Sequence, residues 1–166
     1  MLPVQSDQAF CLSLDSYVCL REATDEDMQE ITELLLYLTS RATLPKEESP
    51  PSLPHSSIIL VAELELNETT KKIVGLIGIH FWNSIRPSQN KTSAYLHDFV
   101  VHPDFRGKGI GKALIEKALK LSEEKASKLH LACSTETKGF YEQYGFAPVA
   151  TTMVKYPSSH DTLENS

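Results

Sequence analysis

A stretch of alternating glycines beside basic residues is the part of this sequence whose spacing best suits a chemical task. Arg106-Gly-Lys-Gly-Ile-Gly follows the apolar run Ala94–Val101 and opens a long amphipathic segment. Backbone N–H groups at the start of a helix lack partners and lie at the positive end of its dipole, and glycine lets an anion approach them closely. The spacing therefore predicts a site for a diphosphate group.

Two familiar phosphate-binding motifs do not fit this loop. A dinucleotide-binding G-x-G-x-x-G motif starting at Gly107 would need glycine at Lys112, and a P-loop ending at Gly111-Lys112 would need glycine at Arg106. The residues instead give Arg-x-x-Gly-x-Gly at positions 106, 109 and 111. An ordinary strand-to-helix turn is the alternative that requires no ligand.

Hydrophobic periodicity predicts the elements that must position this loop. Strands are predicted at 17–22, 57–66, 72–82, 94–101, 128–133 and 149–156, and helices at 109–125, at 136–144 and over about 16 residues from the N-cap Thr24. Segment 41–57 contains prolines that break regular structure. The order of elements is typical of a mixed α/β (α+β) domain.

Composition sets the broad class of the protein. With 166 residues, 41% hydrophobic and 23% charged, the chain has the make-up of one soluble globular domain, and it contains no apolar run long enough to cross a membrane. We expect a flexible tail at 1–15, the folded domain at 16–157 and a disordered tail at 158–166. Three cysteines without metal-ligand spacing favour a reduced, cytoplasmic protein, with a nuclear location left open. No metal is expected.

The distribution of charge favours an anionic ligand and argues against nucleic acid. The net charge is −6, whereas a nucleic-acid-binding domain usually carries a basic surface. Residues 102–128 nevertheless hold seven Lys or Arg and four acids, a net of +3, which leaves −9 for the remainder. A basic segment behind the glycine loop suits an anionic cofactor, and an acidic remainder suits a cationic partner.

Two motifs resemble those of the GNAT acetyltransferase superfamily. Arg-x-x-Gly-x-Gly after a strand ending in Val100-Val101 resembles the family's acyl-CoA pyrophosphate loop, and Gly139–Phe146 resembles its F-Y-x-x-x-G-F segment. The resemblance covers residues 17–156 and implies a single GNAT-type domain, with a twisted mixed central sheet flanked by helices. It also implies acetyl-CoA as co-substrate and direct transfer of the acetyl group to an amine, which makes the protein an N-acetyltransferase.

The resemblance assigns acetyl-CoA to the strand end, the loop and the start of the last helix. In that assignment the loop amides bind the diphosphate, while the strand end pairs with the pantetheine arm and polarises the thioester carbonyl. The cofactor-binding residues expected are Phe99, Val100, Val101, Arg106, Gly107, Lys108, Gly109, Ile110, Gly111, Lys112, Ser134, Thr137 and Tyr141.

Two residues are predicted to be catalytic. Tyr141 is the expected general acid for the leaving thiolate, because a phenol with a pKa near 10 stays protonated at pH 7. Asp98 is the expected base, because a carboxylate in an apolar strand is costly unless it is used or paired. His97, His80 and Glu136 are alternatives, as is deprotonation through water. Alternation places Asp98 on one strand face and His97 on the other, unless a bulge intervenes.

The expected acceptor is the primary amine of a small molecule, and the sequence leaves its identity open. Parts of the chain resemble glucosamine-6-phosphate, polyamine and aminoalkylphosphonate acetyltransferases. His97, Ala132 and Thr137 depart from the first of these, which usually has acids at the first two positions and asparagine at the third. Acetylation of protein or peptide amines, or a non-catalytic acyl-CoA-binding role, are the alternatives. We expect no membrane partner, and a homodimer is open.

Overall fold

The computed structural model describes residues 8–13, 16–38, 57–67, 70–83 and 92–149. They form two compact units, Met1–Leu131 and Ala132–Ser166, and each is described by itself. The mixed α/β class expected from the sequence is confirmed. None of the helices in these residues is long and apolar enough to span a membrane.

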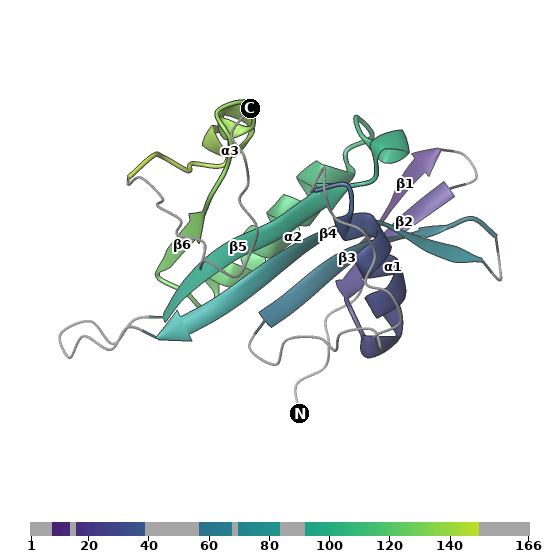
Figure 1. Ribbon diagram of the computed structural model, residues 1–166, viewed down its shortest axis with the longest axis horizontal. Coiled ribbons are helices and arrows are strands. Elements are labelled where there is room, and N and C mark those ends of the chain that lie inside the picture. The colour runs from purple at the N-terminus through teal and green to yellow at the C-terminus, as the bar shows by residue number, and fades with distance from the viewer. Residues whose placement is uncertain (1–7, 14–15, 39–56, 68–69, 84–91, 150–166) are drawn as a thin grey trace, which may run out of the picture. The chain divides into compact units, whose positions relative to one another are not determined.

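The first unit is built on one six-stranded sheet whose strand order follows the chain (Figure 1). Neighbouring strands are antiparallel except for the last pair, which is parallel because a helix connects its members. The strands are β1 (Gln8–Ser13), β2 (Ser16–Glu22), β3 (Ser57–Glu65), β4 (Lys71–Asn83), β5 (Thr92–Val101) and β6 (Lys128–Leu131).

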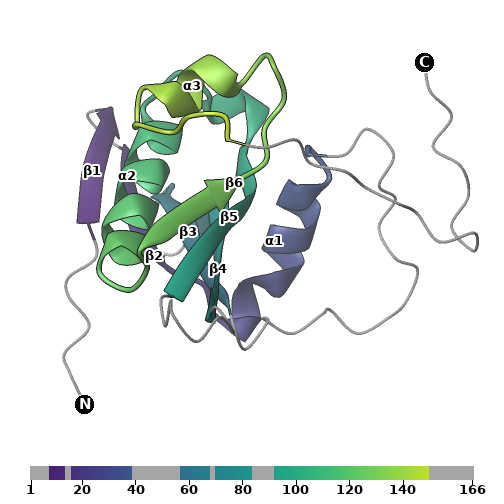
Figure 2. The ribbon, with the colours of Figure 1, turned by 90° about the vertical axis from the view of Figure 1, so that its left-hand side faces the viewer.

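Two helices cover opposite faces of this sheet (Figure 2). On one face, α1 (Met28–Leu35) buries Met28, Ile31 and Leu34 in a cluster that also includes Leu76 and Val100. On the other face, α2 (Ile110–Glu123) buries a stripe consisting of Ile110, Leu114, Ile115 and Ala118. Burying both stripes is the main favourable contribution to the stability of this unit.

An ion-pair network fixes the start of α1 against the sheet. Arg21 of β2 donates two hydrogen bonds to Asp27, of 2.7 and 2.9 Å, and also binds Glu63 of β3. These bonds lower the pKa of Asp27 from 3.8 to about 2. Asp27 also accepts from the Thr24 backbone N–H at 2.7 Å, so Thr24 starts the helical turn as predicted.

Several predicted boundaries differ from the structure. The predicted tail 1–15 contains β1, because its backbone pairs with β2 whatever its side-chain pattern. The first helix is shorter than predicted, since hydrogen bonds from Leu36 to Leu38 reach back three residues instead of four. The strand expected at 128–133 ends at Leu131, which leaves Cys133 exposed.

The second unit contains α3 (Lys138–Glu142), which lies inside the helix predicted at 136–144. Gly145 follows the helix with φ of 83°, the left-handed conformation expected of a C-terminal glycine. The predicted strand at 149–156 beyond Val149, the tail at 158–166 and the proline-rich segment up to residue 56 lie outside the described residues.

Candidate functional site

The glycine loop joins β5 to α2 with its backbone facing open space. Gly107 and Gly109 have φ of 73° and 85°, and a Cβ added to either would meet no atom within 4 Å. Ala113 donates the first hydrogen bond of α2, to the Gly109 carbonyl, so the amides of residues 110–112 have no helical carbonyl before them. The loop therefore has open space beside its glycines and amides that precede the first helical hydrogen bond, and their binding of a diphosphate stays a prediction.

Three basic side chains of the loop contact neighbouring parts of the protein. Arg106 Nε donates to the Val101 carbonyl at 3.0 Å, which fastens the loop to the end of β5. Lys108 lies over the Phe105 ring at 5.0 Å, and Lys112 lies 3.9 Å from Glu116 on the exposed side of α2. Gly111 faces Phe99 and Val101, so α2 begins close against the strand.

A bulge in β5 sets the position of the predicted base. The register against β4 shifts between the pairs Leu76↔Val100 and Gly78↔His97, and Asp98 at this point has φ of 49°. Aspartate is among the few residues that adopt this left-handed conformation readily. Backbone strain of this kind is concentrated at functional sites.

The bulge overturns the simple alternation of strand faces. Phe99 and Val101 are two residues apart and both face α2, as simple alternation along a strand requires. His97, however, lies over Gly78 on the opposite face, which it shares with Val100 of the α1 cluster. The bulge is thus the exception that the sequence left open: the extra residue at Asp98 reverses the order of faces and puts His97 opposite Phe99 and Val101.

Asp98 and His97 form a hydrogen-bonded pair at the bulge. Nδ1 of His97 lies 2.8 Å from Oδ2 of Asp98, and the two side chains are 24% and 56% exposed. The hydrogen bond from His97 lowers the pKa of Asp98 although partial burial opposes it. Asp98 is thus a carboxylate at neutral pH and a partner for the imidazole.

Gly78 makes this arrangement of His97 feasible. A Cβ at position 78 would lie 2.3 Å from Cε1 of His97 and 2.7 Å from each ring nitrogen. Only glycine therefore lets the imidazole lie against the strand in this position. Gly78 could not be predicted from the sequence, because its role depends on the register between two strands.

The pairing of β6 covers only the first part of β5. The four parallel pairs run from Ser93↔Lys128 to Leu96↔Leu131, and β5 continues past them through the bulge to Val101. Phe99, Val100 and Val101, predicted to bind the pantetheine arm, lie in this continuation. They lead directly into the glycine loop, so the first unit brings together the predicted residues 98–112.

The second unit holds the other three predicted residues. Ser134 and Thr137 form a turn before α3, with their hydroxyl oxygens 3.2 Å apart. Tyr141 lies on α3, where its ring contacts those of Phe140 and Phe146. Burial raises the pKa of the Tyr141 phenol, and the nearby Cys133 thiol adds to the effect. Tyr141 therefore stays protonated at neutral pH, as a general acid requires.

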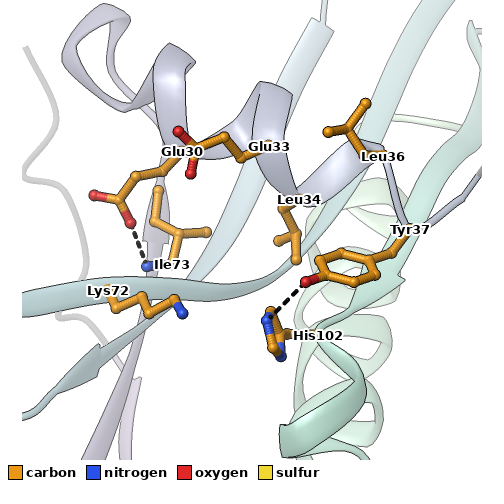
Figure 3. Close-up of a pocket in the computed structure, with 8 residues that line it drawn as sticks. All are labelled: Glu30, Glu33, Leu34, Leu36, Tyr37, Lys72, Ile73 and His102. Carbon is orange, nitrogen blue, oxygen red and sulfur yellow. Dashed lines mark hydrogen bonds between the residues drawn. The ribbon is translucent and has the colours of Figure 1, made fainter. Parts of the chain in front are cut away.

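A pocket of about 400 Å³ lies between α1 and the strands near the start of the glycine loop (Figure 3). The hydroxyl of Tyr37 lies 3.2 Å from Nε2 of His102, and the carboxylate of Glu30 accepts from the Ile73 N–H at 2.8 Å. The Glu30 bond ties α1 to β4, and the Tyr37 contact joins the turn after α1 to His102 before the loop. The pocket is lined by Glu30, Glu33, Leu34, Leu36, Tyr37, Lys72, Ile73 and His102.

No group of three His, Cys, Asp or Glu side chains in the described parts of the chain is arranged to hold a metal ion.

Residues 55–148 match the family model of the acetyltransferase (GNAT) domain. The chain therefore belongs to the GNAT acetyltransferase domain family, as its two motifs indicated. The match spans the sheet from β3 onward, the glycine loop and α3.

Individual relatives agree with this family. The chain is 30% identical over 140 residues to the glucosamine 6-phosphate N-acetyltransferase of Trypanosoma brucei brucei, covering 76% of this chain and 87% of the relative. The crystal structure of glucosamine-6-phosphate N-acetyltransferase from Arabidopsis thaliana superposes with a TM-score of 0.67 at 26% identity, covering 84% and 97% of the two chains.

Other curated relatives are longer than the region they share with this chain. The uncharacterized N-acetyltransferase ycf52 of Porphyra purpurea is 31% identical over 96 residues, which are 57% of this chain and 51% of the relative. The chain spans about half or less of the length of this protein and of the next curated relatives that it matches.

Proposed function

We propose that this protein transfers the acetyl group of acetyl-CoA directly to the primary amine of a small molecule. The observation that carries the proposal is the continuous path from the β5 bulge through Val101 to the open amides at the start of α2. Donor and acceptor sites adjoin along this path, and membership of the GNAT family supports the assignment.

The donor site is proposed to use backbone groups. The amides of residues 107–112 would bind the diphosphate, since the space beside Gly107 and Gly109 is open. The strand from Phe99 to Val101 would bind the pantetheine arm by main-chain hydrogen bonds, as a peptide adds to a sheet. Acetyl-CoA supplies an acetyl group activated as a thioester.

The acceptor amine must lose a proton before or during its attack. Asp98 was the base expected from the sequence, and its lowered pKa makes it a weak base in its own right. We assign Asp98 to orienting His97 through Nδ1, which leaves Nε2 of His97 to take the proton. Asp98 would also attract the incoming ammonium group.

Tyr141 is proposed to protonate the leaving thiolate, and Tyr141→Phe tests that role. We expect kcat to fall at least a hundredfold because the acid is lost, with the affinity for acetyl-CoA retained. Tyr144→Phe, on the next turn of the chain, is the matched control and should keep kcat. Loss of acetyl-CoA affinity in Tyr141→Phe would contradict a purely catalytic role.

A screen of acceptors tests the activity itself. Release of CoA thiol from acetyl-CoA would be followed with glucosamine 6-phosphate, polyamines, aminophosphonates, arylalkylamines and peptides. Glucosamine 6-phosphate is a second candidate acceptor, because the Trypanosoma brucei brucei relative is named for it. If the protein binds acetyl-CoA but acetylates none of these amines, the non-catalytic alternative holds and the proposed activity is wrong.

A further inference from the structure

Next to the His97–Asp98 pair, one face of the sheet carries a row of ring-bearing side chains. We call this row the ring strip; its members are His80, Trp82, Tyr95, His97 and His130. They come from three neighbouring strands, β4 to β6 (Figure 1). The mechanism proposed above uses only His97.

The strand register places these residues on one face. His80 pairs with Tyr95, and Tyr95 with His130, so one row of rings crosses β4, β5 and β6. His97 lies over Gly78. His80 follows Gly78 by two residues, so it points to the same side as His97. The strip is therefore continuous with the proposed catalytic pair.

The rings contact one another along the strip. His80 and Trp82 are stacked, with centroids 6.4 Å apart and planes 15° apart. The Trp82 and His130 centroids lie 5.5 Å apart. Trp82 is 39% exposed although tryptophan is usually well buried, and Tyr95 is half-buried. Exposed aromatic faces of this kind bind planar rings and cations.

The charges around the strip argue for an aromatic ligand over a phosphorylated one. Asp98 lies at its catalytic end. Lys128 is on the same face but pairs with Ser93, four residues before His97, or about 13 Å along the strand. A phosphate attached to a short acceptor at His97 would therefore lie over rings and not beside this lysine.

We propose that the ring strip binds the body of the acceptor, and that the acceptor is an arylalkylamine, a primary amine linked by a short chain to a planar aromatic ring. Tyr95 and His80 form the second residue pair beyond Gly78↔His97, about 7 Å along the strand. An amine at His97, a two-carbon linker and the aromatic ring together cover that distance, so the ring lies over Tyr95. The placing of the acceptor's amine at His97 rests on the acetyl transfer proposed above.

Trp82 is the only tryptophan in the chain, so its fluorescence reports on the strip without any chemistry. 4-Nitrophenethylamine carries an electron-poor ring that accepts an electron from an excited indole in contact with it, and we expect it to quench Trp82 saturably. Phenethylamine should relieve this quenching by competition. 2-Cyclohexylethylamine has the same length but no aromatic face, and should compete about tenfold less well.

Kinetics with matched variants provide a second measurement. We expect Trp82→Leu to raise KM for phenethylamine five- to tenfold and to leave KM for acetyl-CoA within twofold. Phe81→Leu is the control, because Phe81 adjoins Trp82 on the opposite face of β4, with Lys125 over its ring at 5.7 Å. It should leave both constants unchanged.

The outcomes separate this inference from the proposed function. Equal competition by the cyclohexyl and phenyl amines, or unchanged amine kinetics in Trp82→Leu, overturns the inference even if other amines are acetylated. Turnover with glucosamine 6-phosphate and none with arylalkylamines also overturns it. Selective quenching by aromatic amines without acetylation of any amine supports the strip as a binding site and refutes the proposed activity.

Discussion

Alanine at position 78 is the sharpest test of the role given to His97. The new Cβ would lie 2.3 Å from Cε1 of His97, whereas carbon atoms pack favourably at about 3.5 to 4.0 Å. The imidazole must therefore retreat by more than about 1 Å. A displacement of that size in a reacting group costs about a hundredfold in rate.

Stability should change little in this variant. The clashing group is the end of one partly exposed side chain, which can rotate away, so we expect the free energy of unfolding to change by less than about 1 kcal/mol. The assay is thiol release with an amine that the wild type acetylates, measured as a function of pH. We expect kcat to fall about a hundredfold near neutral pH.

Gly75→Ala is the matched control on the same strand. Its Cβ would lie 3.0 Å from Leu114 and 3.2 Å from Ile110, on the face packed against α2. Overpacking there should destabilise the fold by about 1 to 3 kcal/mol and leave kcat of the folded protein unchanged. Urea unfolding monitored by circular dichroism measures this difference.

A double-mutant cycle with His97→Ala decides whether the effect of Gly78→Ala passes through the imidazole. If it does, adding Gly78→Ala to the His97→Ala variant should lower kcat no further. The reasoning is refuted if Gly78→Ala keeps kcat within twofold of the wild type. It is refuted equally if the substitution still costs a hundredfold without His97.

Three further predictions concern the glycine loop and the ion-pair network. Gly109→Val places a β-branched residue at φ of 85°, so KM for acetyl-CoA should rise more than about tenfold, whereas Gly139→Ala, with open space around its Cβ, should leave it unchanged. Arg21→Met leaves the carboxylates of Asp27 and Glu63 without their guanidinium, and should cost about 3 kcal/mol in urea unfolding; a loss below about 0.5 kcal/mol would contradict this. The pKa of Asp27 falls from 3.8 to about 2 on folding, chiefly through its hydrogen bonds to Arg21, so its contribution is complete above about pH 5 and is lost as the pH falls through 2. Allowing for solvent screening, we expect about 1 kcal/mol of pH-dependent stability that Asp27→Asn lacks, measured by urea unfolding between pH 5 and pH 2.

The glycine loop could be predicted because its information is local. The glycines within residues 106–111 by themselves indicate a loop, and the strand before them and the helix after them have clear hydrophobic periodicity. The central strands were predicted for the same reason. The bulge at Asp98 could not be placed, because it depends on how β5 pairs with β4.

The ring strip and the close approach of His97 to Gly78 could not be predicted for a related reason. His80 and Trp82 are two residues apart on one strand, and Tyr95 and His97 on another, so the sequence shows that each pair shares a face of its own strand. The two pairs combine only through the register His80↔Tyr95, which no single segment specifies. Strand β1 was missed because its backbone pairing with β2 needs no distinctive side-chain pattern.

The order of strands in the sheet has a consequence for how the protein folds. Every strand lies beside its neighbour in the sequence, but the connections between them differ in length. The connection from Glu22 to Ser57 is longer than the one from Val101 to Lys128, so the pairing of β2 with β3 closes the longest loop and costs the most entropy. Pairings that close long loops form late, so we expect β2 to join β3 after the folding transition state. Substitutions that weaken only this pairing should then speed unfolding and leave the refolding rate unchanged.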